Sequence, residues 1–69
     1  MRILVTGITG LVGQQIRKIC KAMEVDVHYL TTREDQLEDK EGYQGFYWDP
    51  ADGQIDHRCL QGVEAIIHL

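Results

Sequence analysis

The sequence predicts an α/β fold that forms half of a doubly wound parallel sheet, a partial open sheet with strand order 3-2-1-4. Two observations support this prediction. A short apolar run near the amino terminus stops at glycine and leads into an amphipathic helix, and a second β-rich run follows that helix directly. A strand, helix, strand unit of this kind places its two strands parallel with a right-handed crossover. We expect residues 1–69 to form one unit.

The first elements follow from hydrophobic periodicity. Residues 2–6 have the β-branched composition of a fully buried strand, and residues 25–30 are similar. Between them, residues 11–23 carry apolar side chains at helical spacing, which we expect to pack as one stripe on the sheet. The members of this stripe are Val12, Ile16, Ile19, Cys20 and Met23.

The second half is less regular. Residues 32–45 are polar, acidic and non-periodic, which predicts a solvated loop with one weak helical turn at most. An aromatic strand is expected at residues 45–48 and should end at Asp49-Pro50, because proline cannot donate to a ladder. A short helix is expected at residues 55–60. A fourth, apolar strand is expected at residues 63–69.

Composition limits the class of protein. The chain has 69 residues, of which 43% are hydrophobic and 26% charged, with a net charge of −4. No apolar run is long enough for a membrane span, and no basic stripe offers a nucleic-acid footprint. We expect a cytoplasmic globular protein with a small core. Cys20 and Cys59 are interpreted as buried thiols, and no cysteine or histidine pair has metal-site spacing.

Three glycines at intervals of three residues separate the first strand from the helix. Gly7 allows a tight turn, Gly10 lets a phosphate approach the backbone, and Gly13 allows close contact between helix and sheet. In this context they form a Rossmann dinucleotide-binding fingerprint, in which the helix N-terminus attracts the pyrophosphate. A plain flexible turn is the alternative. The predicted contacts of the pyrophosphate are Gly7, Thr9, Gly10, Leu11, Val12 and Gly13.

The end of the second strand predicts the type of nicotinamide cofactor. An acidic residue there would bind the ribose 2′-hydroxyl of NAD, but the sequence reads Thr31-Thr32-Arg33. Two hydroxyls and a guanidinium suit a 2′-phosphate, which favours NADP. The alternative is NAD, with Arg33 solvated and Glu34 or Asp35 bound to the ribose.

The motif Thr-Gly-x-x-Gly-x-x-Gly at residues 6–13 resembles that of extended short-chain dehydrogenase/reductases. Residues 29–33, 46–50, 55–56 and 62–69 resemble the sugar-nucleotide-epimerase-like, cell-division-inhibitor-like branch. This resemblance implies that Asp49 lies near the adenine. Relatives usually have glycine where the first helix ends, whereas this chain has Met23-Glu24, so a left-handed residue there would cost about 1 kcal/mol or be avoided by another turn.

The resemblance also implies catalysis by a serine or threonine, a tyrosine and a lysine four residues after the tyrosine. This chain contains no serine, and none of its tyrosines is followed by lysine at that spacing. No residue is therefore predicted to be catalytic. We expect the cofactor-binding part of an NADP-dependent epimerase or oxidoreductase.

Two alternatives from other classes stay open. One is a non-catalytic dinucleotide sensor, and the other is an oligomerising structural module with vestigial cofactor binding. The apolar strand at residues 63–69 would form an exposed sheet edge, which predicts a homodimer that pairs two such strands antiparallel.

Overall fold

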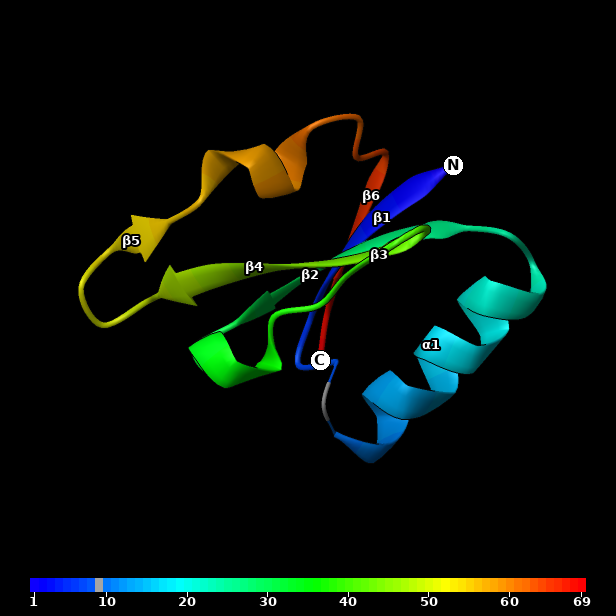
Figure 1. Cartoon of the computed structure of the whole chain (residues 1–69), viewed down its shortest axis with the longest axis horizontal. Coiled ribbons are helices and arrows are strands. Elements are labelled where there is room, and N and C mark those ends of the chain that lie inside the picture. Colours follow the sequence, from blue (N-terminus) through cyan, green and yellow to red (C-terminus); the bar gives the residue numbers. More distant parts are fainter. Residues whose placement is uncertain (9) are drawn as a thin grey trace.

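A mixed β-sheet with one long helix on one of its faces forms the architecture (Figure 1). The computed structural model describes residues 1–8 and 10–69. The longer elements are β1 (Arg2–Thr6), α1 (Leu11–Ala22), β2 (Asp26–Thr31), β4 (Tyr43–Asp49) and β6 (Ala65–His68). The shorter ones are η1 (Glu34–Gln36), β3 (Asp39–Lys40), β5 (Gln54–Ile55) and η2 (His57–Leu60), of which η1 and η2 are 3-10 helices.

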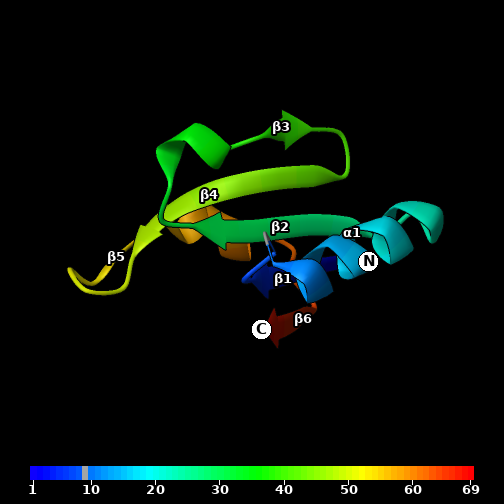
Figure 2. The same cartoon turned by 90° about the horizontal axis from the view of Figure 1, so that it is seen from below.

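The sheet has the order β3-β4-β2-β1-β6, and β5 pairs separately with β4. The four longer strands are parallel to one another, whereas β3 and β5 run antiparallel to β4. Figure 2 shows β3 near one edge of the sheet and β6 at the other. The expectation of a four-stranded sheet in order 3-2-1-4 therefore needs correction, because it omits both short antiparallel strands.

The connection from β2 to β4 differs from the solvated loop expected at residues 32–45. It contains η1 and then β3, which turns back through Gly42, with a φ of 79°, to pair with β4. Strand β4 consequently starts at Tyr43 and is longer than the expected 45–48. Residues 54–60 form β5 and η2, not one helix.

The core lies on both faces of the sheet because side chains alternate along each strand. One buried cluster lies on the α1 face and comprises Ile3, Val5, Ile8, Cys20, Val27 and Tyr29. The other lies on the η2 face and comprises Leu4, Leu30, Phe46 and Cys59. Both cysteines are free and buried. Burial raises the pKa of both thiols, so they are unreactive core groups.

The helix α1 contacts the sheet through a narrower face than the periodicity predicted. Gly13 and Cys20 are buried and Ile16 packs against the core. Val12, Ile19 and Met23 are instead 63%, 56% and 69% exposed. The expected single stripe is therefore wrong at these three positions. Because Gly13 has no side chain, the helix comes very close to the backbone of Ile8 at this position. The contact between α1 and the sheet is therefore centred on the side of the helix that carries Gly13.

Glu24 is left-handed at the end of α1, with a φ of 56°. The Val25 N–H donates to the Cys20 carbonyl at 2.9 Å and the Glu24 N–H donates to the Lys21 carbonyl at 3.3 Å. These two bonds form a Schellman motif, in which glycine usually occupies the left-handed position. The left-handed position at the end of α1 is therefore occupied by Glu24, which costs more free energy there than glycine would.

Residues 1–8 and 10–69 contain neither a membrane-spanning helix nor a metal-binding cluster. No helix in this part of the chain is both long and apolar enough to cross a membrane. No group of three or more histidine, cysteine, aspartate or glutamate residues within it could hold a metal ion.

Candidate functional site

The glycine loop leaves the carboxyl end of β1 and enters α1. Gly7 follows the last residue of β1 and has a φ of 77°, a left-handed conformation that favours glycine. Gly10 is the N-cap of α1, in an extended conformation with φ −75° and ψ 178°. The predicted contact Thr9 lies outside the described residues.

The three glycines are needed for different reasons. A Cβ on Gly13 would overlap the backbone of Ile8, so helix packing requires glycine there. A Cβ on Gly7 would lie 3.1 Å from that of Leu69, in addition to the strained φ. A Cβ on Gly10 would have the Gly7 carbonyl oxygen as its nearest neighbour, at an ordinary 3.7 Å. Apart from its chain neighbours, no described residue therefore lies close enough to require glycine at Gly10.

The first turn of α1 presents backbone N–H donors that lie outside the helical ladder. The first bond of the helical ladder is donated by the Gln14 N–H to the Gly10 carbonyl at 3.0 Å. The N–H groups of Leu11, Val12 and Gly13 precede it and have no partner within the helix. The first turn contains no acidic residue, and Leu11 is 89% exposed. Donors and helix dipole together favour an anion at this end.

The carboxyl end of β2 lies beside the glycine loop. Thr6 pairs with Leu30, so Gly7 and Thr31 are the next residues on adjacent strands. Thr31 is buried, and its hydroxyl accepts a hydrogen bond from the Arg33 N–H at 3.1 Å. Thr32 is exposed. The sheet thus brings the predicted Thr31 to Arg33 segment to the same edge as the glycines.

Arg33 is an exposed cation that already has a partner. Its Nε lies 3.7 Å from the Asp35 carboxylate, and the two side chains are 66% and 73% exposed. An ion pair with this exposure is weak and can be exchanged for a ligand.

A buried tyrosine, Tyr29, holds the β2–β4 connection in place, and this connection contains the ion pair of Arg33 and Asp35. The Tyr29 hydroxyl donates to the Gln36 carbonyl at 2.7 Å and accepts from the Glu38 N–H at 2.9 Å. The Tyr29 ring stacks on Tyr43 with centroids 4.6 Å apart. Burial raises the pKa of the Tyr29 phenol, so it remains a donor at neutral pH. Sequence analysis missed this role because the periodicity of β2 identified Tyr29 only as a core residue.

Glu38 links this connection to α1 and β3. Its carboxylate lies 3.0 Å from the Lys40 ammonium and 3.5 Å from the Arg17 guanidinium. The hydrogen bond from Lys40, followed by the charge of Arg17, lowers the pKa of the Glu38 carboxyl. The Arg17 guanidinium also covers the Tyr43 ring at 3.9 Å.

A cavity of about 270 Å³ connects α1 with the β2–β4 connection. Gln14, in the second turn of α1, and Asp35, next to Arg33, both line it. The cavity therefore lies between the helix that starts at the glycine loop and the residues that follow the segment predicted to bind the 2′ substituent of the ribose.

Asp49 ends β4, on the side of the sheet where the carboxyl ends of the parallel strands and the glycine loop lie. Its Oδ1 accepts hydrogen bonds from the N–H groups of Ala51 and Asp52 at 3.1 and 3.3 Å. The carboxylate therefore caps the turn after β4. The adenine contact implied by the resemblance stays a prediction.

His68, which sequence analysis did not single out, lies at the end of β6 beside the glycine loop. Its Nδ1 is 2.6 Å from the Thr6 hydroxyl, and the next N–H, at Leu69, donates to the Thr6 carbonyl at 3.2 Å. The only signal in the sequence was a polar residue at the end of an apolar strand. These bonds hold β6 against the residue that precedes Gly7.

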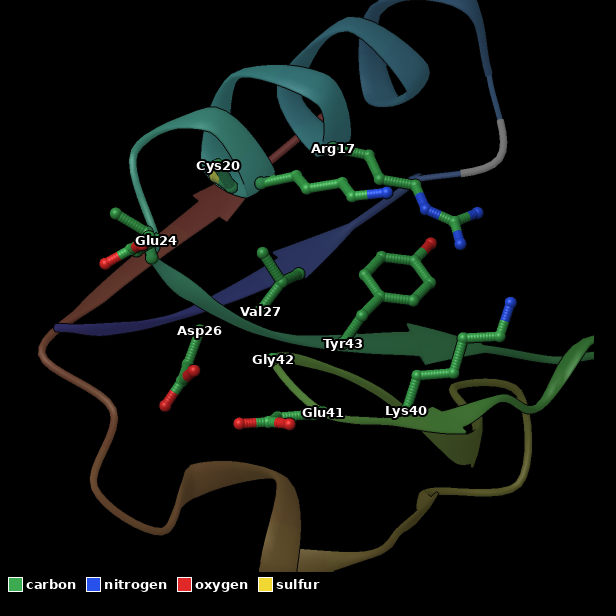
Figure 3. Close-up of a pocket in the computed structure, with 11 residues that line it drawn as sticks. Arg17, Cys20, Glu24, Asp26, Val27, Lys40, Glu41, Gly42 and Tyr43 are labelled. Atoms are coloured by element: carbon green, nitrogen blue, oxygen red, sulfur yellow. The ribbon is translucent and has the colours of Figure 1, made fainter.

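A larger cavity of about 630 Å³ lies at the opposite end of the strands, between α1 and the start of β4 (Figure 3). Between β2 and β4 the chain forms a 3-10 helix and a short strand, whereas parallel strands are usually connected by an α-helix. Its walls carry both cations and carboxylates and so do not select a ligand of one charge. The charged lining residues are Arg17, Lys21, Glu24, Asp26, Lys40 and Glu41.

The model of the NAD dependent epimerase/dehydratase family matches residues 3–69, almost the whole chain. No match was found among the curated proteins or the solved structures.

Proposed function

The chain belongs to the NAD dependent epimerase/dehydratase family, and we propose that its glycine loop binds the pyrophosphate of a nicotinamide dinucleotide. The backbone donors of Leu11, Val12 and Gly13 would hold the phosphates, with Gly7 and Gly10 forming the approach. Within the family we favour the extended short-chain dehydrogenase/reductase type and its cell-division-inhibitor-like branch.

The observation that carries this proposal is the open space at Gly10. Gly7 and Gly13 are explained by backbone conformation and helix packing, whereas a side chain at Gly10 would fit the fold. A glycine that no described neighbour requires, at the N-cap of a helix that no described side chain caps, supports a ligand that approaches the backbone there.

NADP is the favoured cofactor, with NAD as the alternative. Arg33 supports this choice because it is exposed at the edge that carries Gly7, and a guanidinium makes charge-assisted hydrogen bonds to phosphate. Thr32 would offer a second donor. The segment Thr31 to Arg33 contains no carboxylate to repel a 2′-phosphate.

We assign the 69 residues to cofactor binding and none of them to acid–base catalysis. The bound cofactor would supply hydride transfer, as in epimerases and oxidoreductases. The Tyr29 hydroxyl is occupied by two backbone groups, which supports a structural role. A dinucleotide sensor without catalysis would use the same loop.

Calorimetric titration with NADPH, NADH and ADP-ribose tests the proposal. We expect all three to bind the wild-type chain, and Gly10→Val to abolish binding because its side chain fills the approach of the phosphate. Gln15→Val, on the exposed side of α1, is the matched control and should bind normally. Unchanged affinity in a Gly10→Val variant whose circular dichroism is native would refute the proposal. Gly10→Ala serves as a second test if the valine variant unfolds.

A second candidate function is a structural module that associates through β6. Ile66 in this strand is 63% exposed, and β6 is the edge of the sheet. The other edge carries the two-residue β3, whose Asp39 and Lys40 discourage strand pairing. This contrast supports a homodimer through β6, which is compatible with cofactor binding.

A further inference from the structure

Asp35 lies where it affects any ligand of Arg33. The carboxylate is 3.7 Å from the Arg33 Nε and lines the cavity of about 270 Å³ that also contacts Gln14 of α1. A ribose bound between the glycine loop and the end of β2 would bring its 2′ substituent to this pair. Asp35 therefore stands close to the proposed 2′-phosphate position without belonging to the glycine loop.

The backbone on both sides of Asp35 is fastened to the sheet. On one side, the Arg33 N–H donates to the buried Thr31 hydroxyl at 3.1 Å. On the other, the Tyr29 hydroxyl binds the Gln36 carbonyl and the Glu38 N–H. Asp35 itself lies within the short helix η1. When a phosphate binds Arg33 in place of Asp35, these hydrogen bonds therefore keep the backbone around Asp35 in position. The Asp35 carboxylate then stays close to the phosphate.

We propose that Asp35 is a specificity-determining residue that competes with the 2′-phosphate of the cofactor for Arg33. This inference rests on the proposed function, because it assumes a dinucleotide on the glycine loop. A 2′-hydroxyl would not need Arg33, so the pair persists when NAD binds. A 2′-phosphate must break the pair and accept a neighbouring carboxylate. Asp35 thereby reduces the preference for NADP that Arg33 alone would give.

The structure separates Asp35 from its neighbour Glu34. Both carboxylates are exposed and both belong to η1, but the ion pair of Arg33 is with Asp35. Removing either charge changes the net charge equally. A local effect through Arg33 should therefore appear at Asp35 and be much smaller at Glu34.

Calorimetric titration with ADP-ribose and with 2′-phospho-ADP-ribose tests the inference on the intact chain. The measured quantity is the ratio of the two affinities. For Asp35→Asn we expect this ratio to shift by about two- to fivefold toward the 2′-phosphorylated probe, the range of an exposed ion pair. Affinity for ADP-ribose should not change. Glu34→Gln is the matched control and should leave the ratio nearly as it is.

Repeating Asp35→Asn in an Arg33→Gln background tests the competition itself, since the shift should then disappear. An undiminished shift would mean that Asp35 repels the phosphate directly, and the competition would be refuted. Equal shifts in Asp35→Asn and Glu34→Gln, or no shift in either, would also overturn it. A loss of ADP-ribose affinity in Asp35→Asn would instead assign Asp35 to the ribose hydroxyls. If the wild-type chain binds neither probe, the proposed function itself fails.

Discussion

Thr6 and His68 are joined by a hydrogen bond of 2.6 Å between Oγ1 and Nδ1, at the point where β1 passes into the glycine loop. Thr6 is buried, so the lost bond should not be replaced by water without cost. We expect Thr6→Val, which keeps the shape of the side chain, to lower the free energy of unfolding by about 1 kcal/mol. Urea denaturation measures this, and an unchanged midpoint would show that the bond contributes nothing.

Substitution by alanine should unfold the chain at Gly13 but leave it folded at Gly10. Gly13→Ala forces a Cβ into the backbone of Ile8, and we expect a loss of about 3 kcal/mol or more, which would unfold a domain of this size. Apart from the chain neighbours, a Cβ at Gly10 meets no atom of the described residues closer than 3.7 Å, so Gly10→Ala should retain the native circular dichroism spectrum. A folded, wild-type-like Gly13→Ala variant would contradict the packing described for α1.

Glu24 offers a stabilising substitution. Its φ of 56° suits glycine, and both hydrogen bonds of the Schellman motif are donated by the backbone and so remain. We expect Glu24→Gly to raise the free energy of unfolding by about 1 kcal/mol. Thermal melting checks this, with exposed Gln15→Gly inside α1 as the control that should destabilise by a similar amount. A lower melting temperature for Glu24→Gly would mean that the left-handed conformation is not strained.

The stacked pair Tyr29 and Tyr43 gives a matched test of the hydroxyl that fastens the β2–β4 connection. Tyr29→Phe removes the partner of the Gln36 carbonyl and the Glu38 N–H, and we expect it to cost about 1–3 kcal/mol. Tyr43→Phe keeps these bonds and should cost less than about 0.5 kcal/mol. Hydrogen exchange at the Glu38 amide should quicken only in the Tyr29 variant. Equal effects would assign the stability to the rings alone.

Association through β6 is tested by concentration. With Ile66 on the twofold axis of an antiparallel pair, Glu64 of one copy would face His68 of the other. We expect sedimentation to detect dimers at micromolar concentration and the melting temperature to rise with concentration. Ile66→Lys should give monomers, whereas Leu60→Lys, which also alters an exposed apolar residue, should not. A monomeric wild-type chain would reject the dimer.

The parallel strands and α1 could be predicted because apolar runs, glycines and helical spacing leave few alternatives. The side of α1 that faces the sheet could not, since Gly13 contributes no hydrophobic signal but permits the closest contact. The strand β3 has only two residues, Asp39 and Lys40, which is too short for a period of two to be visible. The glycine loop was evident from the spacing of its glycines. The two hydrogen bonds of the Tyr29 hydroxyl, here called the hydroxyl clamp, were not, because their backbone partners are seven and nine residues away.

Tyr29 and Gly45 also place a constraint on how this sequence can diverge. A Cβ on Gly45 would overlap the Tyr29 ring, so the tyrosine occupies the volume that any side chain at residue 45 would need. Within this backbone a larger residue at 45 requires a smaller one at 29. Such a paired exchange would also remove the Tyr29 hydroxyl and its bonds to the Gln36 carbonyl and the Glu38 N–H. Asp35 would then no longer be held beside Arg33. Covariation at these two positions would therefore mark descendants whose cofactor preference has changed without any substitution at Arg33 or Asp35.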